Sequence, residues 1–263
     1  MIRDHETRII ARRDLGPDVF RLALHAPSLA AELRPGQFLM VKVGATHDPL
    51  LRRPLGYLSR DAEEGRIDLL VREVGRGTGL LRRAAPGERI MILGPLGRGF
   101  TLAEGGPVLI AGGGMGIVPL LDLARGLAPR LPVTFVYGAR TASDLHCLEE
   151  LRQLPLRLVL ATDDGSAGER GTVPEAVAAL EPRGFAFYYA CGPVPMLANL
   201  QTLMAGWGVP GELSLEDRMA CGFGACLGCA VPVRGPFGTV VYRRACTDGP
   251  VFPAGEVILD VRP

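Results

Sequence analysis

The sequence predicts a multidomain protein with a β part and an α/β part: an N-terminal antiparallel β-barrel, a central doubly wound parallel α/β sheet and a small C-terminal cysteine module. Three observations predict this organisation. Short alternating strands separated by turns fill the first hundred or so residues, strands then alternate with helices, and four of the six cysteines gather near the C-terminus. A chain of 263 residues is long enough for such domains. We expect their boundaries to be 1–101, 102–211 and 212–263.

The N-terminal part shows strand patterns with turn punctuation. Val19 to Leu24 and Arg66 to Val74 alternate between apolar and polar residues, as half-buried strands do. The turn sequences 35–37 and 86–88 are each followed by a further apolar strand. Strands at this spacing favour an antiparallel barrel or sandwich. One short helix is expected to begin at Thr78, whose hydroxyl group can cap it.

Two segments of this part are suited to binding phosphate. The run 52–57 places the guanidinium of Arg53 beside a strand, where it can hold a phosphate group in bidentate fashion. The run 75–79 opens a helix, whose N-terminal N–H groups form a second anion site. The alternative interpretation of each is structural, because an arginine in a strand is most often a surface residue.

The central part alternates strands with helices, beginning with the buried strand Val108 to Ala111. This alternation predicts a parallel sheet covered by helices on both faces. The further expected strands are 133–137, 156–161 and 186–190, and the expected helices are 119–127, 145–151, 173–180 and 194–204.

A glycine loop, residues 112–116, joins the first strand of this part to its first helix. Such a turn allows backbone N–H groups and the helix N-terminus to meet a pyrophosphate, although a plain tight turn is the alternative. The loop fits the dinucleotide fingerprint only loosely, and Arg140 follows the second strand where an acidic residue is usual. Arg140 is either a surface residue or a contact for the 2′-phosphate of NADP. The predicted nucleotide-binding residues are Gly112, Gly113, Gly114 and Gly116.

The cysteine module carries the most specific motif. Its pattern is C-x4-C-x2-C with a fourth cysteine 17 positions later, the plant-type spacing for a [2Fe–2S] cluster. Glycines within the run allow a tight loop that brings N–H groups close to the sulfurs. Zinc usually takes paired C-x2-C knuckles, and only one such pair is present. Disulfides require an oxidising compartment, and no signal peptide that would direct the chain to one is expected. The predicted cluster ligands are Cys221, Cys226, Cys229 and Cys246.

A cluster and a nucleotide together imply a third group. Nicotinamide transfers two electrons as a hydride, whereas a cluster passes electrons singly, and a flavin is the usual converter between them. We therefore expect the N-terminal part to hold a flavin.

Composition excludes other classes. The net charge is +1 and no basic tract is present, so a nucleic-acid partner is not expected. Glycines and prolines interrupt the longest apolar stretch, Pro107 to Leu123, so no membrane span is expected and the protein is predicted to be cytoplasmic.

With barrel, α/β unit and cluster module in this order, the chain resembles the ferredoxin–NADP reductase superfamily along nearly its whole length. Within that superfamily, the run from Leu215 to Cys229 is similar to the electron-transfer subunit of NAD-dependent (class 1B) dihydroorotate dehydrogenase. The runs 162–166 and 189–193 resemble the same family.

The resemblance implies FAD, a [2Fe–2S] cluster and NAD as cofactors. It implies a relay in pyrimidine (UMP) biosynthesis: electrons pass from the FMN of a separate catalytic subunit through the cluster and FAD to NAD+, within a heterotetramer. It also places Cys191 on the nicotinamide side as the candidate catalytic residue, the alternative being a small buried cysteine at a strand end. The implied FAD-binding residues are Arg53, Pro54, Leu55, Gly56, Leu70, Val71, Arg72, Gly77 and Thr78.

Gly56 departs from the pattern of this family, which usually has Ser or Thr near the flavin at this position. A hydroxyl hydrogen bond to the flavin is therefore lost, or replaced by a backbone N–H. Two alternatives stay open: the electron-transfer subunit of a sister complex, such as a sulfhydrogenase or an NADH-dependent reduced ferredoxin:NADP reductase, and a non-catalytic adaptor stabilised by zinc.

Overall fold

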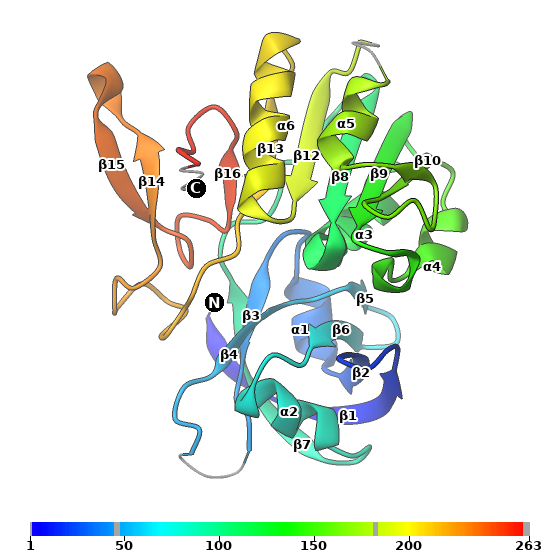
Figure 1. Ribbon diagram of the computed structural model, residues 1–263. Coiled ribbons are helices and arrows are strands. Elements are labelled where there is room, and N and C mark those ends of the chain that lie inside the picture. The colour runs from blue at the N-terminus through cyan, green and yellow to red at the C-terminus, as the bar shows by residue number, and fades with distance from the viewer. Residues whose placement is uncertain (1, 45–47, 181–183, 260–263) are drawn as a thin grey trace.

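The computed structural model describes residues 2–44, 48–180 and 184–259. Figure 1 shows two large sheets, the N-terminal one below the central one, with a separate hairpin beside the central sheet. Three groups of secondary-structure elements therefore follow one another along the chain, as predicted.

The N-terminal part is a curled antiparallel sheet of seven strands in the order β4-β3-β7-β1-β2-β6-β5. Its interior holds fully buried side chains from alternating positions, such as Phe20, Leu22 and Leu69. The predicted antiparallel barrel is thus confirmed as a half-barrel. Its elements are β1 (Arg3–Asp14), β2 (Val19–His25), α1 (Pro27–Glu32), β3 (Phe38–Val41), β4 (Arg53–Gly56), β5 (Ser59–Asp61), β6 (Arg66–Arg72), α2 (Arg76–Arg83) and β7 (Arg89–Leu96).

Strand β1 was not anticipated from the sequence. Two of its inward-facing residues, His5 and Thr7, are polar, so the strand lacks a clear apolar alternation. Both are satisfied by the neighbouring strand: Thr7 Oγ1 donates to Ile90 O at 2.9 Å, and His5 Nε2 lies 3.1 Å from Gly94 O.

Helix α2 begins at Arg76, so the predicted start at Thr78 is wrong by two residues. The hydroxyl of Thr78 still caps the helix from its third position, where it accepts hydrogen bonds from the backbone N–H groups of Val74 (2.9 Å) and Gly75 (3.2 Å). Glycine at the N-cap cannot supply this acceptor itself.

The central sheet has the order β11-β10-β9-β8-β12-β13-β16, and all its strands are parallel except β16. Its strands are β8 (Val108–Gly113), β9 (Val133–Ala139), β10 (Arg157–Thr162), β11 (Glu169–Arg170), β12 (Phe187–Cys191), β13 (Gly211–Ser214) and β16 (Val251–Pro253). Its helices are α3 (Ile117–Leu127), α4 (Leu148–Arg152), α5 (Val173–Ala178) and α6 (Val194–Gly206).

Both faces of this sheet are covered. On one face, Leu109 and Ala111 of β8 belong to the core formed with α5 and α6; on the other, Val108 and Ile110 belong to the core formed with α3. Figure 1 shows α5 and α6 in front of the strands and α3 behind. The doubly wound sheet is confirmed. The helix expected from residue 145 begins only at Leu148, because Leu145 is extended and Cys147 has a left-handed backbone with a φ of 59°.

The chain leaves the central sheet after β13 and returns as β16, which pairs with β13. Between them lie the cysteine loop (residues 219–229) and the hairpin of β14 (Ala230–Arg234) and β15 (Val240–Arg244). Hydrogen-bonded strands therefore cross the boundary expected at residue 211. No helix in the described residues is long and apolar enough to cross a membrane.

Candidate redox site

A cleft of about 1010 Å³ lies between the half-barrel and the central sheet. Strands β4 and β6 supply one wall, and the glycine loop and the end of β12 supply the other. Helices α3 and α6, which follow the neighbouring strands β8 and β12, cover opposite faces of the sheet. The cleft thus opens where the winding direction changes, the usual position of ligand sites in such sheets.

Six of the nine predicted FAD-binding residues line this cleft. They come from two strands of the half-barrel and offer apolar surface together with one guanidinium group. These residues are Pro54, Leu55, Gly56, Leu70, Val71 and Arg72.

The other three, Arg53, Gly77 and Thr78, lie outside the cleft but come together at the start of α2. The side chain of Arg53 covers Gly77 so closely that a Cβ on this glycine would overlap Arg53 Nε. The two segments predicted as separate phosphate sites therefore lie together. They form a single candidate site, in which the guanidinium of Arg53 lies at the N-terminus of α2.

Gly56 leaves room for helix α3. A Cβ built on this glycine would lie 3.0 Å from Val118 Cγ1, and both residues line the cleft. A serine or threonine at position 56 would crowd this valine, whose side chain would have to move.

The glycine loop is shaped by close packing. A Cβ on Gly113 would lie 2.6 Å from Met196 Sδ, and one on Gly116 would overlap Cys191 O. Tyr137 fixes the loop, since its hydroxyl donates to Gly114 O at 3.1 Å. Among the predicted nucleotide-binding residues, Gly113, Gly114 and Gly116 line the cleft. Gly112 does not: it lies within β8, where a Cβ would come 3.3 Å from Leu120 Cδ1.

Cys191 is fully buried at the end of β12 and lines the same cleft. Burial raises the pKa of its thiol, the carboxylate of Glu216 raises it further, and a hydrogen bond with Ser214 only partly opposes this. Its surroundings therefore favour the neutral thiol, which lines the cleft. The catalytic role of Cys191 stays a prediction.

The segment before the cysteines also reaches the cleft, through Glu216, Asp217 and Met219. Glu216 is exposed and lines the cleft; its pKa is raised, because desolvation outweighs the opposing effect of Arg72. The sequence offered one signal for these residues, their position directly before Cys221, but no way to place them beside the glycine loop.

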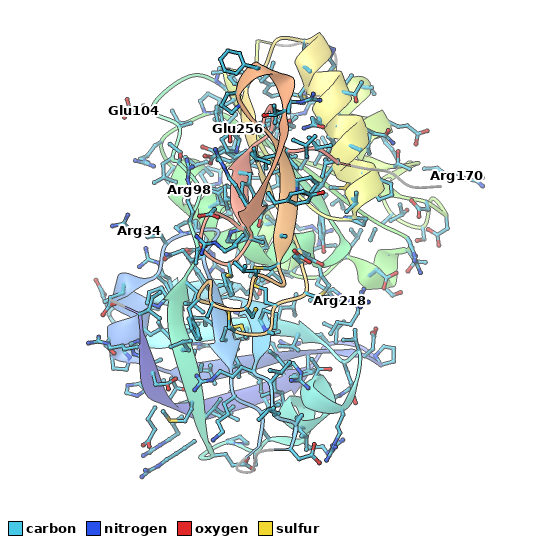
Figure 2. All side chains as sticks on the ribbon, turned by 90° about the vertical axis from the view of Figure 1, so that its left-hand side faces the viewer. Arg34, Arg98, Glu104, Arg170, Arg218 and Glu256 are labelled. Atoms are coloured by element: carbon cyan, nitrogen blue, oxygen red, sulfur yellow. The ribbon has the colours of Figure 1, made fainter. Side chains whose placement is uncertain are left out.

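The four predicted ligand cysteines come together at the base of the hairpin. The N–H of Ala245 donates to Cys229 O at 2.8 Å, and Ala230 pairs with Arg244, so Cys229 and Cys246 are neighbours. The 17-residue spacing is thus the length of the hairpin between them. Figure 2 shows yellow sulfur atoms in the region below the hairpin.

The surroundings favour negative charge on the sulfur of Cys221 and disfavour it on that of Cys246. Desolvation opposes ionisation of Cys221, but backbone N–H groups of Cys226, Phe223 and Ala225 lower its pKa to about 6. Burial and the neighbouring Cys229 raise the pKa of Cys246 to about 12. None of the four thiols forms a disulfide. Neighbouring thiolates repel one another, and bound iron would relieve that repulsion.

The donor set fits a two-iron cluster. Among the described residues, no three His, Cys, Asp or Glu side chains converge as the ligands of one metal ion do. A [2Fe–2S] cluster divides its four thiolates between two irons, so it has no need of such a convergence.

Known proteins match each part of this architecture. Residues 6–100 match the oxidoreductase FAD-binding domain, 109–202 the oxidoreductase NAD-binding domain, and 216–258 the iron–sulfur cluster binding domain of dihydroorotate dehydrogenase B. The electron transfer subunit of dihydroorotate dehydrogenase B (NAD(+)) from Desulforamulus reducens is 42% identical over 98% of this chain and 99% of its own length. That from Geobacillus thermodenitrificans is 40% identical over 98% and 100%.

The chain belongs to this family of electron transfer subunits. Membership in the dihydroorotate dehydrogenase B family confirms the predicted resemblance, the oxidoreductase class, and FAD, NAD and an iron–sulfur cluster as cofactors. It also implies a catalytic partner subunit.

Solved structures agree with this assignment. The NADH-dependent reduced ferredoxin–NADP oxidoreductase, studied for flavin-based electron bifurcation, has a chain 33% identical to this one with a TM-score of 0.86, covering 96% of this chain and 90% of that one. The ferredoxin reductase in carbazole 1,9a-dioxygenase is 26% identical with a TM-score of 0.66, covering 79% and 67%. Neither favours a sister complex over the dihydroorotate dehydrogenase B family, whose curated members are more similar in sequence.

Proposed function

We propose that this chain takes electrons from the FMN of a dihydroorotate-oxidising catalytic subunit and passes them through a [2Fe–2S] cluster and FAD to NAD+. One observation supports this most directly. The cleft, lined by six of the nine candidate flavin residues and three of the four candidate nucleotide residues, extends to Met219, two positions before the cluster ligand Cys221. Every candidate group of the relay thus adjoins one continuous site.

The chain's own residues bind and orient the groups of this relay. Arg53 and the N-terminus of α2 neutralise the phosphates of FAD, while Pro54, Leu70 and Val71 offer apolar surface to its ring. The glycine loop takes the nicotinamide nucleotide. When bound, the flavin supplies the conversion of single electrons into a hydride.

We propose that the four cysteines hold the cluster, and that the backbone N–H groups around Cys221 stabilise the charge on its sulfur. The domains of this relay are proposed at 1–101, 102–211 and 212–263.

The cysteine loop is the proposed contact with the catalytic subunit, in a heterotetramer of two copies of each. Cys226 is exposed, and beside it Phe223 and Leu227 expose 51% and 64% of their surfaces. Leu227 holds this position with a φ of 59°, which is unfavourable for leucine. An exposed ligand between two apolar side chains suits a surface that docks on a protein and exchanges electrons there.

The experiment is affinity purification of the chain from its native host, followed by iron and FAD analysis and a test of dihydroorotate-dependent NAD+ reduction. Activity with a co-purifying flavoprotein supports the proposal. A flavin-loaded eluate that ignores dihydroorotate but oxidises NADH or NADPH assigns the chain to a sister complex. A colourless protein that contains zinc overturns the relay altogether.

A second experiment tests the docking surface in the purified complex. Leu227→Asp is expected to weaken binding of the catalytic subunit at least about tenfold, as a charge at the centre of an interface does. Val240→Asp, at an exposed position on the hairpin away from Cys226, serves as the control. Equal binding by Leu227→Asp and the parent would contradict the proposed contact.

A further inference from the structure

The cysteine loop rests directly on strand β3 of the half-barrel. Gly222, next to the ligand Cys221, has a φ of 81° and faces the fully buried side chain of Met40. A Cβ on this glycine would overlap Met40 Cγ and would lie 2.9 Å from Met40 Sδ and 3.4 Å from Leu96 Cδ1. The loop and this methionine therefore have no space between them for even one methyl group.

Strand β3 is also part of the wall of the flavin cleft. It pairs with β4 in the register Met40 with Pro54 and Phe38 with Gly56, and Phe38, Pro54 and Gly56 all line the cleft. Phe38 and Met40 are two positions apart, so the same face of this pair of strands contacts the cysteine loop at Met40 and borders the candidate flavin site at Phe38.

Other contacts hold the far side of the loop. Arg244 Nη1 donates to Gly224 O at 3.3 Å, and the N–H of Arg98 donates to Gly249 O at 2.5 Å, which ties the base of the hairpin to the end of β7. Because these hydrogen bonds hold the far side of the loop, the size of the Met40 side chain fixes the distance between Cys221 and strand β3.

We propose that Met40 is a positioning residue for electron transfer, because its side chain sets the separation between the cluster ligand Cys221 and the flavin cleft. This inference rests on the proposed function, which takes the four cysteines as cluster ligands and the cleft as the FAD site. No bond forms or breaks at Met40. Each electron leaves the reduced cluster and enters the flavin; two such transfers, with one proton from solvent, make up the hydride that NAD+ receives.

The test uses a compensating pair of substitutions in the complete complex. Gly222→Ala is expected to slow electron exchange between FAD and the cluster about tenfold, since misplacement of reacting groups by about 1 Å can cost even more. Adding Met40→Ala removes the atoms that the new methyl group meets. The double variant is therefore expected to recover most of the lost rate, a coupling that a double-mutant cycle measures.

Gly224→Ala is the matched control. Gly224 lies in the same loop with a φ of 89°, but a Cβ there would meet Thr247 Cγ2 at 2.9 Å and Arg244, not Met40. Backbone strain is thus similar at both glycines, and Met40→Ala should rescue only Gly222→Ala. Rescue of both glycine variants, or of neither, overturns the proposal.

Three readouts separate positioning from general damage. The rate of cluster reduction by NADH reports electron exchange, the midpoint potential of the cluster reports driving force, and hydrogen exchange of residues 219–229 reports the seating of the loop. We expect the rate and the hydrogen exchange to change together while the potential stays constant. Where Gly222→Ala loses iron, recovery of iron content by Met40→Ala replaces the rate as the readout. A parent protein without iron or flavin would instead refute the proposed function.

Discussion

The glycine loop after β8 and the cysteine loop after β13 are both rich in glycine, but they use it differently. In the glycine loop, Gly113 and Gly116 allow the backbone to pack against Met196 and Cys191. In the cysteine loop, Gly222 and Gly224 turn the chain through positive φ around the sulfurs. Glycines alone are therefore weak evidence for a ligand, since packing explains them equally well, whereas cysteine spacing specifies the ligand itself.

The largest expected effect comes from removing a cluster ligand. Cys229→Ser should abolish the cluster and NAD+ reduction by the complex, because one iron loses a thiolate at a buried position. Flavin content and NADH oxidation with an artificial electron acceptor should persist, as measured by absorption spectra and steady-state assays. Cys147→Ser, far from this set in sequence and placed at the start of α4, is the control. Loss of iron in both variants would break the assignment.

The glycine loop should be almost as sensitive, but for a packing reason. Gly116→Ala forces a methyl group against Cys191 O, so unfolding free energy should fall by about 1–3 kcal/mol and NAD+ affinity should fall with it. Gly126→Ala in helix α3, which follows Gly116, meets nothing within 4 Å and should stabilise the protein by up to about 1 kcal/mol. Chemical denaturation and NAD+ titration measure both. An unchanged Gly116→Ala would show that packing does not require this glycine.

An effect of comparable size, on FAD binding alone, is expected where Arg53 meets the start of α2. Arg53→Ala should weaken FAD binding by about 1.5–3 kcal/mol, the usual contribution of hydrogen bonds to a charged group. Arg52→Ala, which removes an exposed ion pair with Asp4, should leave FAD affinity close to that of the parent. Fluorescence titration of the flavin-free protein separates the two, and equal losses would contradict a specific role for Arg53.

The smallest effect depends on pH and tests the half-barrel that supports both loops. Burial opposes ionisation of Asp68, but Arg21 at 2.9 Å and Arg66 at 3.0 Å outweigh this and lower its pKa. The stabilising contribution of Asp68 is therefore fully present above the pKa of an aspartate in the unfolded chain, about 3.9. It is lost as the pH falls through the lower pKa that Asp68 has in the folded protein.

Asp68→Asn should lower the unfolding free energy at neutral pH by about 1 kcal/mol, because its arginine partners are partly exposed. The difference from the parent should shrink as the pH falls below about 3.9. Glu6→Gln, in an exposed pair with Arg89, is the control. A difference that persists unchanged in acid would rule out the carboxylate as its source.

Much of the fold could be predicted because its signals are local. Alternation in β2 and β6, the buried run of β8 and the cysteine spacing each depend on neighbouring residues only. Strand β1 could not be found in this way, since His5 and Thr7 face inward and are satisfied by β7, a partner distant in sequence.

The site was predicted less completely than the fold, for the same reason. Arg53 and Gly77 were expected as two phosphate sites and form one, because only the curl of the half-barrel brings them together. Glu216 and Met219 belong to the run from Leu215 to Cys229, but that motif does not predict that they line the cleft. Their position follows from β13 lying beside β12, a pairing that no local pattern specifies.

The return of the chain from β13 to β16 has a practical consequence. Ser214 and Val251 are register partners on β13 and β16, so everything between them is an excursion whose two ends are held side by side by the central sheet. The tip of the hairpin, where Phe237 is fully exposed, lies within that excursion at the opposite end of the hairpin from Cys229 and Cys246. A reporter group or tether inserted at the tip would be carried outside the electron path, which makes it the natural point for attaching this protein to an electrode or a synthetic partner.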